Sequence, residues 1–156
     1  GNTTLANLEA VTRGPLMDLG RERVLAEQFL DQLDIQAQSV SQEVQYLSGG
    51  NRQKVMLSKW LCRGLEVFLL DEPTQGVDVG AREEIHRIMN GLLEEGKGIV
   101  MVTSDLDELM KMSHHISVMH KGQVVAHLDT LGTTREEVLS YALGQRSQQT
   151  ECEPAA

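Results

Sequence analysis

The sequence predicts an α/β fold with parallel core strands flanked by helices, a helical part at the N-terminal side and a β-hairpin towards the C-terminal side. Two short apolar runs, at residues 67–70 and 99–103, lie on either side of an amphipathic stretch at residues 81–95. Strand, helix and strand in this order form a right-handed parallel crossover, so both strands end at the same edge of the sheet. A hydrophobic share of 40% and a charged share of 24% are typical of a globular protein.

The N-terminal part is predicted to be helical. Apolar side chains recur at helical spacing among charged neighbours in residues 21–33. A polar stretch at residues 36–45 follows, and Ser48-Gly49-Gly50 then opens a second helical pattern that continues through residues 55–61. The first part of the chain therefore consists of two helices joined by a polar loop.

Each apolar run is predicted to form a buried strand of a parallel sheet. The first run ends in Asp71-Glu72-Pro73, and Pro73 ends the strand because proline has no backbone N–H to donate. The two carboxylates therefore follow the carboxyl end of a strand, which is the edge where open α/β sheets bind ligands.

The C-terminal part is predicted to form a helix at residues 106–112, a hairpin of residues 116–119 and 124–127, and a short helix within residues 134–143. Residues 145–156 are polar and aperiodic, which predicts a disordered tail.

Charge and cysteine content argue against several classes of protein. The formal net charge is −9, whereas nonspecific binding to nucleic acid depends on basic side chains that neutralise phosphates. No apolar run approaches the roughly 20 residues that a membrane-spanning helix needs, so no insertion into a membrane is expected. Cys62 and Cys152 show no ligand or disulfide spacing, which favours reduced thiols in the cytosol.

Histidines raise a metal hypothesis that the pattern does not favour. His114 and His115 are adjacent, while His120 and His127 belong to the predicted hairpin. Because no cysteine or carboxylate set accompanies them, surface histidines are the favoured interpretation.

Two short stretches have residue types suited to phosphate chemistry. Ser48-Gly49-Gly50 at a helix start combines backbone N–H groups, a hydroxyl and the positive end of a helix dipole, which suits a phosphate. Asp71 can bind Mg²⁺ and Glu72 can polarise a water molecule. Taken alone, each stretch is also explained without a ligand, as a helix cap and as an acidic turn.

The two stretches together resemble a known family. Residues 47–55 resemble the signature loop of ATP-binding-cassette (ABC) proteins, and residues 67–74 resemble their Walker B strand with its adjoining catalytic glutamate. Residues 75–81 resemble the D-loop that follows, with Gly76, Val77 and Asp78 at its centre. The resemblance covers roughly residues 16–128, and several motifs in the right order make it specific.

The resemblance implies a partial P-loop NTPase fold of the ABC type. Residues 1–144 are then an incomplete ABC ATPase domain. About 1–62 would be a helical subdomain with the signature helix, and about 63–144 would be the core with Walker B, D-loop and switch. The permease-contacting surface would lie in the helical part before Leu47.

The form of the signature and D-loops is similar to that of ribose, galactose and xylose importer ATPases, which carry two cassettes in one polypeptide. The chain is most similar to the second cassette. The resemblance implies ATP and Mg²⁺ as cofactors of the complete protein, a second cassette and membrane permease subunits as partners, and a peripheral location on the cytoplasmic face of the cell membrane. It does not imply nucleic acid as a partner.

The resemblance also implies a role for each motif residue. Asp71 would bind Mg²⁺, and Glu72 would be the catalytic residue that orients the attacking water. The signature loop, Ser48, Gly49, Gly50 and Asn51, would bind a nucleotide held by the opposite cassette. Ser48, Gly49 and Gly50 would contact its γ-phosphate.

Two departures from the family pattern bear on activity. Ser104 stands at the switch position, where the family normally has a histidine, and a short hydroxyl cannot reach or polarise as an imidazole does. No Gly-x-x-x-x-Gly-Lys-Ser/Thr run occurs in the sequence, so the family's Walker A loop is expected upstream of Gly1. We therefore expect the chain alone to be inactive as an ATPase.

Two alternatives to the ATP-binding subunit of a sugar importer remain. The first is a noncatalytic half that dimerises and donates its signature loop to a partner's site. The second, which the acidic charge disfavours, is a soluble ABC ATPase acting on nucleic acid or ribosomes.

Overall fold

A computed structural model describes residues 2–13 and 16–146. The chain divides into two compact units, Gly1–Val102 and Thr103–Ala156, and each is described here by itself. The predicted subdomain boundary near residue 62 stays a prediction. Most of the predicted tail, residues 147–156, lies outside the described residues.

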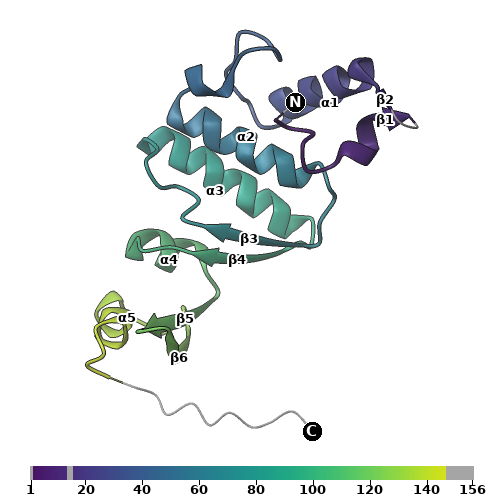
Figure 1. The fold of residues 1–156 in the computed structure, drawn as a ribbon. Coiled ribbons are helices and arrows are strands. Elements are labelled where there is room, and N and C mark those ends of the chain that lie inside the picture. Colours follow the sequence, from purple (N-terminus) through teal and green to yellow (C-terminus); the bar gives the residue numbers. More distant parts are fainter. Residues whose placement is uncertain (1, 14–15, 147–156) are drawn as a thin grey trace, which may run out of the picture. The chain divides into compact units, whose positions relative to one another are not determined.

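The first unit contains all the elements up to residue 102 (Figure 1). In chain order these are η1 (Leu8–Val11), β1 (Thr12–Arg13), β2 (Leu16–Met17), α1 (Leu19–Gln32), η2 (Val44–Tyr46), α2 (Gly49–Leu61), β3 (Val67–Asp71), α3 (Val79–Glu94) and β4 (Gly98–Val102).

Strands β3 and β4 form the predicted parallel pair, in register from Val67 opposite Gly98 to Asp71 opposite Val102. Helices α2 and α3 lie side by side on one face of this sheet (Figure 1). On the helix-covered face β3 buries Phe68 and Leu70. A separate core cluster joins α1, α2 and the loop between them through Phe29, Leu33, Ile35, Leu47 and Val55.

The expectation that both strands would be buried is wrong for one face of the sheet. Val67 is 62% exposed, Leu69 74% and Val100 54%. The physical reason is that the helices cover one face only, so that buried and exposed side chains alternate along β3 with the period of a strand. Among the described residues, β3 and β4 pair only with each other.

The second unit contains α4 (Leu106–Met112), the hairpin strands β5 (His115–His120) and β6 (Gln123–Asp129), and α5 (Arg135–Ala142). The hairpin is antiparallel, as predicted, with a shift in register between Val118 and Met119. Helix α5 packs against the hairpin, and the core of the unit consists of Ile116, Val118, Ala126, Val138 and Tyr141.

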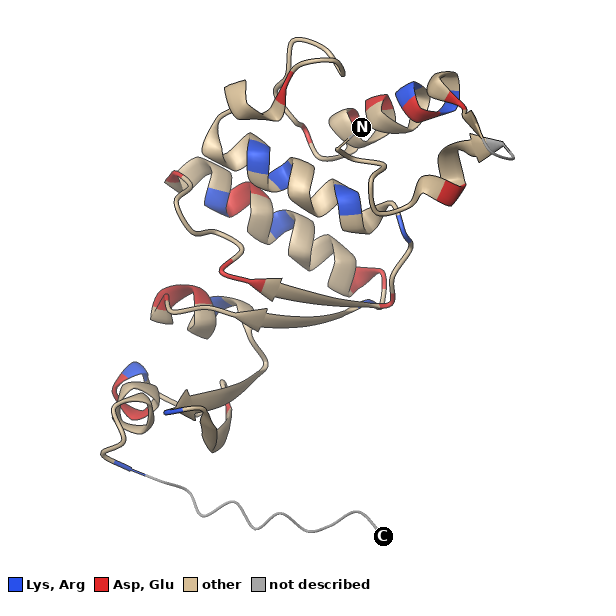
Figure 2. Cartoon of the chain, viewed as in Figure 1, with Lys and Arg blue, Asp and Glu red and all other residues tan. Residues whose placement is uncertain are grey.

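Charged side chains of both signs are interspersed along α1 and α3, whereas the charged side chains of α2, Arg52, Lys54 and Lys59, are all basic (Figure 2). In the part of the chain that the structure describes, no helix has the length and apolar character needed to cross a bilayer.

Candidate functional site

The stretches that the sequence singles out meet at one end of the first unit. Helices α2 and α3 both begin near the end of the sheet at which β3 finishes (Figure 1). A Cβ atom added at Gly49 would be 3.1 Å from the Gly76 carbonyl oxygen, so the signature and D-loops are in direct contact. The structure therefore places Gly49 of the segment Ser48–Asn51 against Gly76 of the segment Gly76–Asp78, and Asp71 and Glu72 precede the latter at the carboxyl end of β3.

Ser48 is the N-cap of α2. Its side-chain oxygen accepts hydrogen bonds from the Asn51 backbone N–H at 3.3 Å and from Asn51 Nδ2 at 2.9 Å. Ser48 is exposed to solvent. The first N–H groups of α2 have no partner within the helix, so the exposed start of α2 can bind an anion.

Asp78 has the equivalent position at the start of α3. Its Oδ1 accepts a hydrogen bond from the Ala81 backbone N–H at 2.9 Å. Both Ser48 and Asp78 thus act as helix caps. For Ser48 the sequence had left two interpretations open, a helix cap and a phosphate-binding residue.

The glycines of the signature loop permit the close approach of α2 to α3. A Cβ atom added at Gly50 would be only 2.3 Å from the Ala81 Cβ, and Gly50 is buried. No side chain fits at this position without a shift of α3. The contact fixes the distance between the signature loop and the D-loop within this chain.

The carboxylates at the end of β3 differ in backbone conformation. Asp71 is the last residue of the strand and is exposed. Glu72 has a φ of 46°, in the left-handed region that non-glycine residues rarely adopt. Its N–H donates to the Val102 carbonyl at 2.8 Å, and its carbonyl accepts from the Gln75 N–H at 3.1 Å. Pairing to β4 thus holds the turn that begins at Glu72.

The donor set fits Mg²⁺ bound together with a phosphate better than a metal held by protein alone. Among the described residues, no group of three or more His, Cys, Asp or Glu side chains could hold a metal ion. Magnesium is commonly bound by one or two carboxylates together with substrate phosphates, and the exposed Asp71 can supply one such carboxylate.

Ser104 belongs to the second unit and is exposed. The residues on both sides of it are fixed by a buried carboxylate that sequence reasoning missed. Glu108 is 2% exposed and accepts from the Thr103 hydroxyl at 2.7 Å, and that hydroxyl oxygen accepts from the Asp105 N–H at 3.1 Å. The turn containing Ser104 is therefore well defined within its own unit.

Lys54 is a second buried charge that sequence reasoning missed. It is 2% exposed, and its Nζ lies 2.7 Å from the Asp34 carbonyl oxygen and 2.6 Å from Glu84 Oε2. The signal in the sequence was its position four residues after Gly50 and four before Ser58, on the buried side of α2. Lys54 joins the end of α1 to both α2 and α3.

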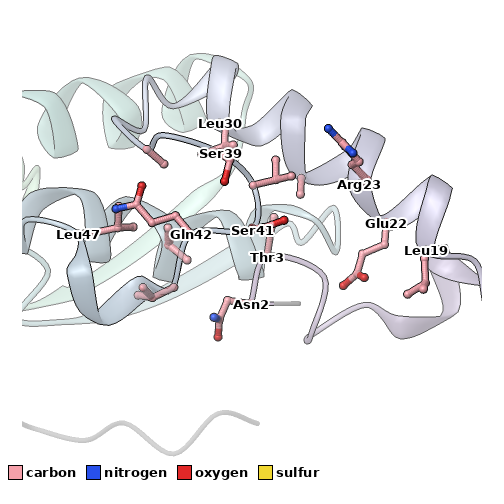
Figure 3. Close-up of a pocket in the computed structure, with 15 residues that line it drawn as sticks. Asn2, Thr3, Leu19, Glu22, Arg23, Leu30, Ser39, Ser41, Gln42 and Leu47 are labelled. Carbon is pink, nitrogen blue, oxygen red and sulfur yellow. The ribbon is translucent and has the colours of Figure 1, made fainter.

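The first unit also has a pocket of about 420 Å³ between α1 and the loop that follows it (Figure 3). Its lining includes Glu22, Arg23 and Leu30 from α1 and Ser39 and Gln42 from the loop. None of the predicted site residues lines it. The pocket is therefore separate from the end of the unit where the signature loop and D-loop meet.

Comparisons with known proteins show which sequences this chain is similar to. A protein-family model described as "ABC transporter" matches residues 3–75. A ribose import ATP-binding protein from Rubrobacter xylanophilus is 43% identical over 142 residues, which is 90% of this chain and 28% of that protein. A protein from Agrobacterium fabrum, named for ribose, galactose and methyl galactoside import, is 42% identical over 144 residues, again 28% of its length.

Solved structures show the same fold. A nucleotide-free ATP-binding cassette from an ABC transporter matches with a TM-score of 0.68 at 21% identity, over 92% of this chain and 57% of the other. A bacterial ABC transporter cassette, described as a dimeric structure, matches with a TM-score of 0.64 at 25% identity, over 78% of this chain and 52% of the other. The chain thus spans about 28% of the curated relatives and about half of the solved cassettes.

Proposed function

We propose that this chain carries part of an ABC transporter ATP-binding domain and that it works in the ATP-binding subunit of an importer for a sugar or a similar small solute. The observation that carries the proposal is the contact of the signature loop with the D-loop at the carboxyl end of β3, through Gly49 and Gly76. The relatives named for ribose and galactose import support the class of solute.

Each residue of the assembled end has a role in this function. Ser48, Gly49 and Gly50 present their donors to the γ-phosphate of a nucleotide that the opposite cassette holds. Asp71 would hold Mg²⁺, which would supply positive charge to neutralise the phosphate oxygens. Glu72 orients the attacking water, and its hydrogen bonds to Val102 and Gln75 hold its backbone in place.

The complete protein would couple ATP binding and hydrolysis to solute uptake. Its partners would be a second cassette and membrane permease subunits, and it would lie on the cytoplasmic face of the membrane. The pocket beside α1 belongs to the helical part before Leu47, where we expect the permease to make contact.

A second candidate is a noncatalytic half that donates its signature loop to a partner's site. One observation favours it, namely Ser104 at the switch position. An ABC ATPase that acts on nucleic acid or ribosomes is the remaining alternative. The net charge of −9 disfavours it, and salt-dependent binding to RNA or DNA would revive it.

The test is to add the chain to an intact cassette from a ribose-type importer and to measure ATP hydrolysis. We expect the wild-type chain to stimulate hydrolysis and Ser48→Ala to reduce the stimulation about tenfold, because a hydrogen bond to a charged phosphate is lost. Ser39→Ala makes the same chemical change at an exposed serine outside the signature loop and should leave the stimulation unchanged. Absence of any stimulation by the wild-type chain would contradict the signature-donating role.

A second measurement concerns the chain's own ATP site. Titration calorimetry with magnesium-ATP should show no tight binding by the chain alone. Tight binding that is abolished by Asp71→Ala would show instead that another segment of these residues supplies a phosphate cradle.

A further inference from the structure

Asn51 uses both ends of its side-chain amide inside the protein. Its Oδ1 accepts a hydrogen bond from the Gln36 backbone N–H at 2.9 Å. Its Nδ2 donates to Ser48 Oγ at 2.9 Å. The side chain thus bridges the loop after α1 and the cap of α2.

The chemistry of these partners fixes the orientation of the amide. The Gln36 backbone N–H can only donate, so it must face the amide oxygen of Asn51. The NH₂ group is then directed to Ser48. Turning the amide over would set two donors against each other at Gln36.

This arrangement determines what the Ser48 hydroxyl can offer a ligand. A serine oxygen has two acceptor positions and one proton to donate. The Asn51 backbone N–H and Nδ2 occupy the two acceptor positions at 3.3 Å and 2.9 Å. Ser48 is exposed, and the capacity that remains to it is donation of its own proton.

The far end of the bridge is itself anchored. Two residues before Gln36, the Asp34 carbonyl oxygen accepts a hydrogen bond from Lys54 Nζ at 2.7 Å. The same Lys54 ammonium pairs with Glu84 of α3 and is almost fully buried. Lys54 therefore links the segment just before Gln36 to α2 and α3, and the Gln36 N–H faces Asn51 from this anchored segment.

We propose that Asn51 is a positioning residue that holds the Ser48 hydroxyl as a hydrogen-bond donor towards a phosphate oxygen, and that Asn51 does not itself contact the nucleotide. The inference rests on the proposed function only in taking a phosphate as the ligand. It gives Asn51 a different role from the direct contact that the family resemblance implies. A phosphate oxygen accepts hydrogen bonds and does not donate them, so a serine restricted to donation suits it.

The experiment follows nuclear magnetic resonance signals of the full ¹⁵N-labelled chain during titration with inorganic pyrophosphate. In the wild-type chain we expect the backbone amides of Ser48, Gly49 and Gly50 to shift, while the side-chain NH₂ signals of Asn51 stay within the range set by remote amides. An NH₂ signal that moves as far as the Ser48 amide would overturn the proposal, because it would place the anion on Asn51. Absence of any shift at residues 48–50 would overturn it as well.

Variants give an independent measure of the coupling between Asn51 and Ser48. Ser48→Ala and Asn51→Ala should each raise the dissociation constant of pyrophosphate about tenfold, and the double variant should raise it no further, because Asn51 acts through Ser48. Losses that multiply in the double variant would show that Asn51 contacts the anion directly. Asn90→Ala makes the same truncation at an exposed position on α3 and serves as the control.

The proposal and the proposed function fail in different ways. If the chain does not stimulate an intact cassette, the signature-donating role in the proposed function is wrong, but the Asn51 signals still report where the anion lies. If stimulation occurs and the Asn51 amide contacts pyrophosphate, the function stands and the positioning role is wrong.

Discussion

At Glu72 the chain adopts a backbone conformation that a side chain disfavours. The φ of 46° belongs to the left-handed region, where a residue with a Cβ atom is destabilised by about 1–2 kcal/mol relative to glycine. The hydrogen bonds of its N–H to Val102 and of its carbonyl to Gln75 hold the turn in place. Strain of this kind is often found at functional sites, in agreement with the catalytic role proposed for Glu72.

This strain predicts a difference between two truncations of the same side chain. Glu72→Gly should be more stable than Glu72→Ala by about 1 kcal/mol, because both remove the carboxylate but only glycine accepts a positive φ without strain. Urea unfolding of both variants, followed by circular dichroism, measures the difference. Equal stability of the two variants would show that the turn relaxes once the carboxylate is gone.

A second prediction at this scale concerns Cys62. Burial raises the pKa of the Cys62 thiol, and a hydrogen bond with Asn7 opposes the effect. Because the folded-state pKa exceeds the unfolded one, this group favours the folded state below the unfolded pKa, and the contribution is lost as the pH rises through the folded pKa. In a Cys152→Ser background, the alkylation rate of Cys62 should rise at a higher pH in the folded chain than in urea. The prediction would be contradicted if the alkylation rate of Cys62 had the same pH profile in the folded chain and in urea.

Among the elements, the packing of α2 on α3 depends on one missing side chain. Gly50→Ala would place a Cβ atom 2.3 Å from that of Ala81, so we expect a loss of about 1–3 kcal/mol in the free energy of unfolding from overpacking. Adding Ala81→Gly to the same chain should recover part of the loss. Gly91→Ala, on a side of α3 where nothing lies within 4 Å of the added atom, should instead be neutral or stabilising. Thermal unfolding of the variants makes the comparison.

The existence of the longer elements was predictable from the sequence, and their starts were less so. Helix α3 begins at Val79, before the predicted start at residue 81, because the Asp78 side chain caps it. Helix α1 likewise begins at Leu19, where Asp18 caps it. The two-residue strands β1 and β2 were not predicted, since such short strands have no periodic pattern.

The motif residues of the candidate site were predictable because they lie in order along the chain. Their supporting contacts were not. Asn51 bonds to a residue 15 positions away and Lys54 to one 20 positions away, and no local pattern reveals how the chain returns to these points. The partial exposure of β3 also depends on which layers surround the sheet, and not on its own sequence.

For the whole molecule, the open face of the β3–β4 sheet predicts self-association. Apolar side chains at this face are exposed, with Leu69 at 74%, and the strands pair only with each other among the described residues. Exposed apolar faces and unpaired strands favour association between chains. We expect concentration-dependent sedimentation of the wild-type chain.

Leu69→Lys should reduce this association, because a charge on the open face opposes contact with a second apolar surface. The control is Leu131→Lys, at a residue that belongs to the second unit and is 97% exposed. Analytical ultracentrifugation over a range of concentrations compares the three chains. A wild-type chain that stays monomeric throughout, or an equal effect of both substitutions, would contradict the prediction.

The close approach of Gly50 to Ala81 also has an evolutionary consequence. Since the two positions share room for one methyl group, a lineage cannot enlarge one of them unless the helices move apart. Substitutions at these sites should therefore be correlated among descendants of a common ancestor, with glycine kept at position 50 wherever position 81 carries a side chain. The signature loop and the D-loop would then be inherited as one unit, although 25 residues separate Gly50 from Gly76 in the sequence.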